Sequence, residues 1–252
     1  MTAHLFRLIG AGVASASLLA ACGGGGGGAP AASSTPTTAS FALSAGYTAY
    51  VKSGTNKSFN VAVTQTTGTC SGTATIVTTP APQTTFEGFT AYPLTQDSTL
   101  TLTTCALTSS PTHGTTYYNA NYVPIGLAIT GGDYAKFDSA QPDQLALPAS
   151  VTVGATATFD TLTSYTDSTK AVRTGTRALS YQIVADGSTT TTAIANIVTV
   201  FSDVATPANV LSTQTSSYRM AADGTLTLLT IDVQFSAFAD LKQTHLVYTA
   251  TN

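Results

Sequence analysis

Charged side chains are scarce in this sequence, and tryptophan is absent. Asp, Glu, Lys and Arg make up 8% of the 252 residues, whereas about a quarter of an average globular protein is charged. The nine basic residues form no cluster and the formal net charge is −3, so the chain lacks the basic surface that binds nucleic acid. Tyr, Phe, Val, Ile and Leu recur throughout, which favours a folded core over disorder. We expect a weakly charged, folded protein with no nucleic-acid partner.

Catalytic and metal-binding motifs are also missing. Glu87 is the only glutamate, and no pair of carboxylates suggests a glycosidase. His113 and His245 have no cysteine or acidic residue at the spacing of a zinc site. We therefore expect His113 in an exposed loop and His245 on the surface of the last strand. The sequence predicts no enzyme activity, no metal site and no cofactor.

The amino terminus has the pattern of a secretory leader. Arg7 lies in a short first region, and an apolar run follows from Leu8 to about Ala20. This run is too short to span a bilayer comfortably as a helix. It therefore favours export rather than a membrane-spanning anchor.

The leader ends in the most specific motif of the chain, Leu19-Ala20-Ala21-Cys22. This segment resembles the lipobox of bacterial lipoproteins, in which small residues fit the signal peptidase and the cysteine thiol receives diacylglycerol. The resemblance implies that residues 1–21 are a signal peptide and that Cys22 becomes the lipid-bearing first residue. Two or three acyl chains make such an anchor durable, because each buried methylene contributes ~0.8 kcal/mol.

Residues 22–40 have the composition of a flexible, disordered tether. Six glycines, 23–28, are followed by a segment of Ala, Pro, Ser and Thr that has no apolar surface to bury. The residue after the cysteine is Gly23, not Asp, and by resemblance to the lipoprotein sorting rule this implies the outer membrane. A lipobox followed by polyglycine is similar to uncharacterised lipoproteins of Burkholderia-like β-proteobacteria, a resemblance that implies no known activity.

From Phe41 onward the apolar residues recur with a period of two, as in residues 151–159 and 179–183. No window longer than ten residues shows a helical stripe. We predict an all-β fold, with a small antiparallel β-sandwich-like domain over residues 41–125 and a long-stranded antiparallel β-meander domain over residues 126–252. A boundary within 138–148 and a single large β domain are the alternatives.

Two hairpins are predicted in the second half. Asp186-Gly187 and Asp223-Gly224 each lie between apolar runs and favour type I′ turns. In the second hairpin the apolar parity changes between Leu228 and Leu229. This change predicts a β-bulge there, or a strand whose start is buried on both faces.

Cys70 and Cys105 are expected to form a disulfide, because both belong to an exported chain in an oxidising setting. In the chain-entropy model such a bridge contributes about 3–4 kcal/mol. A competing hypothesis takes the G-x-C-x-G pattern of residues 68–72 as a nucleophile elbow built on Cys70. That elbow needs a helix directly after the cysteine, whereas residues 73–79 are predicted as a strand.

Tyr117, Tyr118 and Tyr122 form an aromatic cluster interleaved with asparagine. Such a cluster suits a binding surface, or a hinge that packs between two domains. The hinge is the favoured interpretation, since the absence of tryptophan weakens a sugar-binding platform.

The sequence thus predicts a lipid-anchored envelope lipoprotein of the outer membrane with a non-catalytic binding or structural role. It would contact the membrane through its N-terminal acyl chains, and its protein or small-ligand partner is not indicated. The alternative is a carrier or chaperone of an apolar ligand in a curved β-sheet cavity. That alternative predicts an open apolar concavity beside residues 177–235, and a closed, filled core would count against it.

Overall fold

Antiparallel strands dominate the structure, a computed structural model that describes residues 39–103, 111–236 and 243–251. Twelve of them form one closed β-barrel, in the order β3-β2-β15-β14-β13-β12-β11-β10-β8-β7-β6-β5, and the pairing of β3 with β5 closes the ring. The barrel strands are β2 (Thr55–Gln65), β3 (Gly68–Pro80), β5 (Phe89–Thr103), β6 (Thr112–Tyr118), β7 (Pro124–Ile129), β8 (Tyr134–Phe137), β10 (Thr156–Tyr165), β11 (Arg173–Ala185), β12 (Thr192–Asp203), β13 (Val210–Ala221), β14 (Leu226–Phe235) and β15 (Thr244–Ala250). The remaining elements are β1 (Ser40–Phe41), α1 (Leu43–Ser53), β4 (Thr84–Phe86), the 3-10 turn η1 (Pro142–Gln144) and β9 (Val151–Thr152).

The all-β prediction is confirmed, but the sandwich followed by a meander is wrong, because the strands form a barrel. The last strand, β15, pairs with the first barrel strand, β2, so that Tyr248 lies opposite Val61. The expected domain boundary between residues 125 and 126 falls inside β7, and strands from both sides of it belong to the same barrel. The pairing of strands from the two ends of a chain leaves no signal in the local apolar periodicity, so barrel closure was not predicted. Closure leaves the sheet without exposed edge strands.

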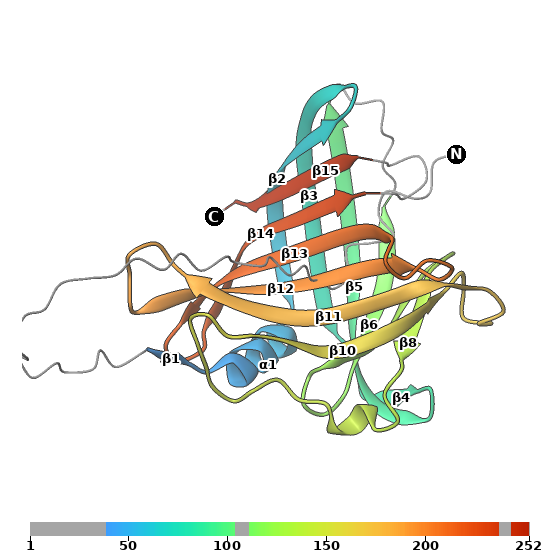
Figure 1. Cartoon of the computed structure of the whole chain (residues 1–252), viewed down its shortest axis with the longest axis horizontal. Helices are drawn as coiled ribbons and strands as arrows, with labels where there is room; N and C mark the ends of the chain where they lie inside the picture. The colour runs from blue at the N-terminus through green and yellow to red at the C-terminus, as the bar shows by residue number, and fades with distance from the viewer. Residues whose placement is uncertain (1–38, 104–110, 237–242, 252) are drawn as a thin grey trace, which may run out of the picture.

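The strands of the two halves cross one another. In Figure 1, β10 to β15 pass in front of β2, β3, β5 and β6, and α1 lies at the lower end of the molecule. Buried side chains of α1 belong to the same core cluster as the inward-facing Phe59, Tyr218 and Ile231. A barrel of twelve strands is wider than the eight-stranded barrels that side chains alone fill. The helix therefore closes one end of the barrel with its own side chains.

The helix α1 was not predicted from the sequence, and its eleven residues exceed the ten-residue window by only one. Its start at Ala42 has no side-chain cap, and Gly46 interrupts the apolar stripe. The buried positions nevertheless recur at helical spacing: Leu43, Gly46, Tyr47 and Val51. Gly46 is required by close packing, because a Cβ there would lie 1.8 Å from the carbonyl oxygen of Gly224. Neither α1 nor η1, the helices of the described residues, has the length and apolarity needed to span a membrane.

Both predicted hairpins are present, β11 with β12 and β13 with β14. Their loops are longer than two residues, however, and the expected type I′ turns are wrong. Such a turn needs positive φ at both central residues, whereas only Gly187 (61°) and Gly224 (90°) have it and the preceding aspartates do not. The Asp223 carboxylate instead accepts a hydrogen bond from the Thr225 backbone N–H at 2.8 Å.

The predicted β-bulge in β14 is confirmed. Ser217 pairs with Thr230 and Tyr218 pairs with Leu228, so Leu229 is the extra residue. The bulge changes the parity of the strand, and the apolar positions on both sides of it are therefore buried on the inner face.

Candidate ligand-binding cavity

A cavity of about 110 Å³ lies inside the barrel beside α1. Its lining consists of Tyr47, Tyr50, Val51, Thr55, Lys57, Phe59, Ile76, Thr78, Leu94, Gln96, Ile197, Gln214, Ser216, Tyr218, Leu228 and Ile231. The helix forms its floor, β2, β3 and β5 form one wall, and β12, β13 and β14 form the other. The volume is below the ~300–1,000 Å³ of pockets for drug-sized ligands, so the space suits a small ligand or water.

Strand parity places the polar lining residues. Lys57 lies two residues before the buried Phe59 on β2, so both side chains face inward, and Lys57 is paired with Ile76 of β3. On the opposite wall, Gln214, Ser216 and Tyr218 alternate along β13 with more exposed residues. Alternation therefore explains how each wall contributes both apolar and polar side chains to one space.

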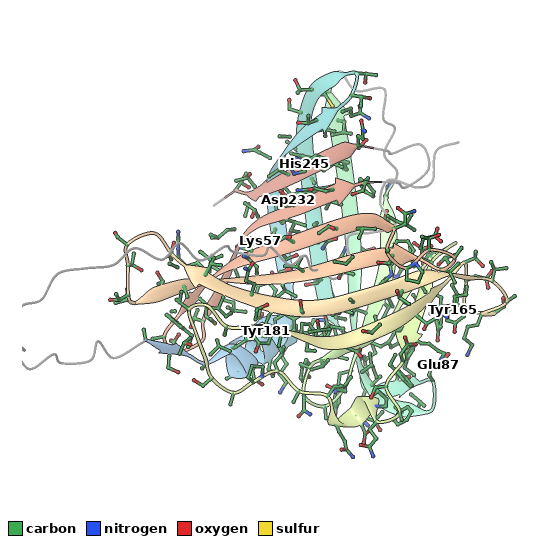
Figure 2. All side chains as sticks on the ribbon, viewed as in Figure 1. Lys57, Glu87, Tyr165, Tyr181, Asp232 and His245 are labelled. Atoms are coloured by element: carbon green, nitrogen blue, oxygen red, sulfur yellow. The ribbon has the colours of Figure 1, made fainter. Side chains whose placement is uncertain are left out.

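Lys57 is the only charged residue in the cavity lining. Its side chain comes from β2 and is labelled in Figure 2. Five ion pairs join residues within 39–103, 111–236 and 243–251, and Lys57 belongs to none of them. Among the described residues, the cavity lining thus includes one lysine and no acidic residue.

Gln214 has an unsatisfied polar atom in this cavity. The residue is 5% exposed, and its Oε1 has no hydrogen-bond partner in the described part of the chain. Leaving a buried acceptor unpaired costs about 1–3 kcal/mol. A donor from outside the protein, either water or a ligand, would satisfy it.

Tyrosine hydroxyls make up the remaining polar part of the floor and wall. Tyr50 interacts through its hydroxyl with Thr55 and Tyr218, and burial raises its pKa to about 12. The rings of Tyr50 and Tyr218 meet edge to face, with centroids 5.1 Å apart. Burial also raises the pKa of Tyr47 and of Tyr218 well above the ordinary value. These hydroxyls stay protonated at neutral pH and can therefore donate hydrogen bonds.

A second polar region of the barrel interior surrounds Arg177, which is 1% exposed. Its Nε donates to Ser164 Oγ at 2.9 Å, its Nη2 lies 3.6 Å from Asp133 Oδ2, and its guanidinium lies 4.6 Å from the ring centre of Phe201. Burial lowers the pKa of Arg177, while Asp133 opposes that shift. The Arg177 guanidinium thus has three polar or aromatic neighbours: a hydroxyl acceptor, a carboxylate and a ring face.

Unpartnered polar atoms link the two regions. Asp160, Thr199 and Gln214 lie in one row across the sheet, because Asp160 and Thr199 both pair with Leu179 and Thr199 also pairs with Gln214. Each of the three has a buried side-chain oxygen without a partner among the described residues. Thr199 also lines, with Arg177, a small space of about 10 Å³, which is about one probe sphere of a water. The interior row therefore has the polarity and the room for internal water.

The three sequence-predicted tyrosines do not form one surface. Tyr117 stacks on Phe86 of β4, with ring centroids 4.2 Å apart. Tyr118 is 6% exposed and its hydroxyl interacts with that of Tyr47. Tyr122 has a φ of 57° and stacks against another tyrosine, Tyr92, at 5.6 Å. Tyr118 and Tyr122 lie next to each other, with ring centroids 6.2 Å apart, and both contact α1: Tyr118 through Tyr47, and Tyr122 through Lys52, whose Nζ lies 4.8 Å from its ring centre.

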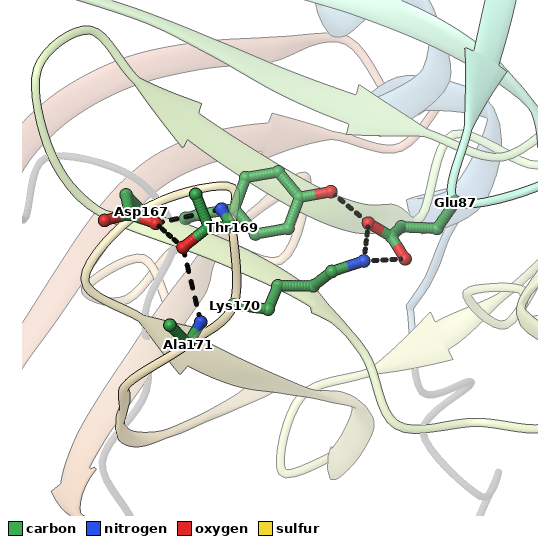
Figure 3. Close-up of polar contacts among 6 residues, drawn as sticks. Glu87, Asp167, Thr169, Lys170 and Ala171 are labelled. Atoms are coloured by element: carbon green, nitrogen blue, oxygen red, sulfur yellow. Dashed lines mark hydrogen bonds and ion pairs between the residues drawn. The ribbon is translucent and has the colours of Figure 1, made fainter.

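Glu87 forms an ion pair and a hydrogen bond outside the barrel. Its carboxylate accepts hydrogen bonds from Lys170 Nζ at 2.8 and 2.9 Å and from the Tyr134 hydroxyl at 2.5 Å (Figure 3). Lys170 follows a tight turn in which the Asp167 carboxylate accepts two hydrogen bonds from Thr169. These contacts fasten the β4–β5 hairpin to the β10–β11 loop.

Both histidines lie beside an aspartate. His113 is on β6, not in the expected loop, and its Nδ1 is 2.7 Å from Asp97 Oδ1. His245 is on β15, as predicted, with its Nε2 2.9 Å from Asp232 Oδ2 (Figure 2). Among the described residues, no three His, Cys, Asp or Glu side chains are grouped to hold a metal ion.

The lipobox, Cys22, the tether up to residue 38 and Cys105 lie outside the described residues. Cys70 lies on β3, and the strand continues to Pro80 without the helix that a nucleophile elbow needs. The next residue, Ser71, pairs with Thr103 on β5. Thr103 comes two residues before Cys105. Because Cys105 is not among the described residues, the Cys70–Cys105 disulfide stays a prediction.

Comparison with known proteins finds no matching family model, no similar curated protein and no similar solved structure.

Proposed function

We propose that this protein is a lipid-anchored, non-catalytic binding protein of the bacterial envelope, attached to the outer membrane, and that it binds a small molecule in the cavity beside α1. The unpartnered Oε1 of Gln214 in the cavity wall is the observation on which the binding role rests. A site that is largely apolar, with a few convergent polar groups, is typical of small-molecule binding.

The anchor rests on the resemblance of residues 19–22 to a lipobox. A tether of about 18 residues has a root-mean-square reach of roughly 20–25 Å, which would hold the barrel clear of the lipid headgroups. Incorporation of labelled palmitate in the native host tests it. We expect a labelled protein that begins at Cys22 and a Cys22→Ala variant that takes up no label. An unlabelled wild-type chain that still begins at Met1 would contradict the anchor.

Native mass spectrometry of the protein released from its own membranes tests the binding role. We expect a bound small molecule in the wild type and none in Ser216→Leu, which fills the cavity. The matched control is Ser217→Leu, since Ser217 faces away from the cavity on the same strand. Equal occupancy in the two variants, or no bound molecule in the wild type, would contradict a binding role for this cavity.

A carrier of long apolar ligands is the second candidate, because Ile197, Leu228 and Ile231 line the cavity beside the hairpins where an apolar concavity was expected. The space is too small for an acyl chain while α1 occupies the barrel end. This candidate therefore requires α1 to move. Lipid that copurifies with the protein, and whose binding exposes α1 to hydrogen exchange, would favour it over the small-molecule role.

A further inference from the structure

The charges and hydrogen-bonding groups of the cavity indicate the chemistry of its ligand. The wall contains one cation, Lys57, and no anion. Three other described lysine or arginine residues have a carboxylate partner: Lys170 and Arg219 at 2.8 Å, and Arg177 at 3.6 Å. Lys57 is partly buried on the inner face of β2 without such a partner. An anionic ligand would supply the missing charge.

The opposite wall of the cavity needs a hydrogen-bond donor from the ligand rather than a negative charge. Gln214 Oε1 is an acceptor without a donor, and it comes from β13, which is separated from β2 by β14 and β15 in the barrel order. A ligand between the two walls would thus place an anionic group toward Lys57 and a hydrogen-bond donor toward Gln214. The apolar lining between them, with Phe59, Ile76 and Ile231, suits a short carbon skeleton.

The charge of the lining and the volume of the cavity limit the chemical class of the ligand further. One ammonium compensates one negative charge, and an unbalanced second charge in a partly buried site costs several kcal/mol. A carboxylate with its single charge therefore fits better than a phosphate, which is close to dianionic at neutral pH. The space of about 110 Å³ restricts the ligand to a few carbon atoms.

We propose that the cavity binds a short monocarboxylic acid carrying a hydroxyl or amino group, with the carboxylate on Lys57 and the donor on Gln214 Oε1. This inference rests on the proposed binding function and names its ligand class. The contact with Lys57 is charge-assisted, and the contact with Gln214 satisfies a buried acceptor that otherwise has no partner among the described residues. The loss of either contact is expected to weaken binding about tenfold.

Calorimetric titration of the full-length protein with four probes tests the proposal: 3-hydroxybutyrate, butyrate, 3-hydroxybutyramide and inorganic phosphate. We expect 3-hydroxybutyrate to bind tightest, and the probes that lack the hydroxyl or the charge to bind about tenfold more weakly. Lys57→Met should remove the preference for the acid over the amide. Gln214→Met should remove the preference for the hydroxy acid over butyrate. Lys52→Met, on the exposed side of α1, is the matched control and should leave all four affinities unchanged.

The outcomes separate this inference from the proposed function. Equal binding of acid and amide to the wild type, or tighter binding of phosphate, would overturn the carboxylate while leaving a ligand in the cavity. An equal loss in Lys52→Met and Lys57→Met would show a general charge effect and overturn the assignment of Lys57. Failure of all four probes, together with a wild type that carries no ligand in native mass spectra, would overturn both. Circular dichroism confirms that each variant is folded.

Discussion

The barrel interior holds two polar regions that differ in how their cations are compensated. Arg177 contacts Ser164, Asp133 and the ring of Phe201, and only its Nη1 lacks a partner among the described residues. Lys57, beside α1, has no carboxylate partner there and lines a cavity about ten times larger than the space beside Arg177.

This difference separates a structural cation from one that is available to a ligand. Removing one member of a buried ion pair leaves the other charge uncompensated and is strongly destabilising. A partly buried lysine without a partner contributes little to folding, and its ammonium is free to bind an incoming anion. The following predictions test this contrast.

Arg177→Met should have the largest effect on stability. The substitution leaves the largely buried Asp133 without its cation, and we expect the free energy of unfolding to fall by about 3–5 kcal/mol. Urea unfolding measures it. Arg219→Met, which removes an exposed pair with Asp186, is the control and should change stability by less than about 1 kcal/mol. Similar losses in both variants would contradict a structural role specific to Arg177.

Gly46→Ala should destabilise the α1 end of the barrel. The added Cβ would lie 1.8 Å from the Gly224 carbonyl oxygen, so α1 must shift, at an expected cost of about 1–3 kcal/mol. The matched control is Ala49→Ser on the exposed side of α1. If α1 forms the cavity floor, Gly46→Ala also weakens ligand binding, whereas Ala49→Ser does not. Unchanged unfolding in Gly46→Ala would contradict the close packing of the helix against the β13–β14 turn.

Asp160 should make stability depend on pH. Burial raises its pKa to about 7 in the folded protein, whereas an unfolded Asp titrates near 3.9. Between these values the folded state binds more protons, so the contribution of Asp160 to stability is present below about pH 4 and is lost as the pH rises to about 7. Asp160→Asn should therefore stabilise the protein relative to wild type at pH 8 but not at pH 4. Urea unfolding at both pH values measures this, and a gain that is equal at the two would contradict the shifted pKa.

Gln214→Met should have the smallest effect on stability and a clear effect on binding. Replacing an unpaired buried carbonyl with an apolar group of similar length removes a desolvation penalty. The free energy of unfolding without ligand should therefore stay unchanged or rise by up to about 1 kcal/mol. Functional sites often retain such costs. Gln234→Met, on the exposed side of β14, is the control. A loss of more than about 1 kcal/mol in Gln214→Met would mean that its side chain has a structural partner.

The sequence predicts the strands of this barrel better than their closure. Period-two alternation and the parity change at Leu228 lead directly to the β-strands and to the bulge. The pairing of Tyr248 with Val61 is not predictable in this way, because contacts between distant segments have no local signature. The helix was missed because Gly46, which its packing requires, interrupts the apolar stripe.

The candidate site was harder to predict than the fold. Lys57 and Gln214 are ordinary polar residues of alternating strands, and only barrel closure brings β2 and β13 around one space. The tyrosine cluster was visible in the sequence but is divided between the outside of the barrel and its core. A cluster of aromatic residues can thus be recognised in the sequence. Whether a charged side chain has an ion-pair partner can be judged only from the folded chain.

A crystal structure of the protein purified from its own membranes tests the central claim most directly. We expect electron density for a small molecule that contacts both Lys57 Nζ and Gln214 Oε1. Density for water alone in the cavity, with the Lys57 ammonium turned out into bulk solvent, would contradict it.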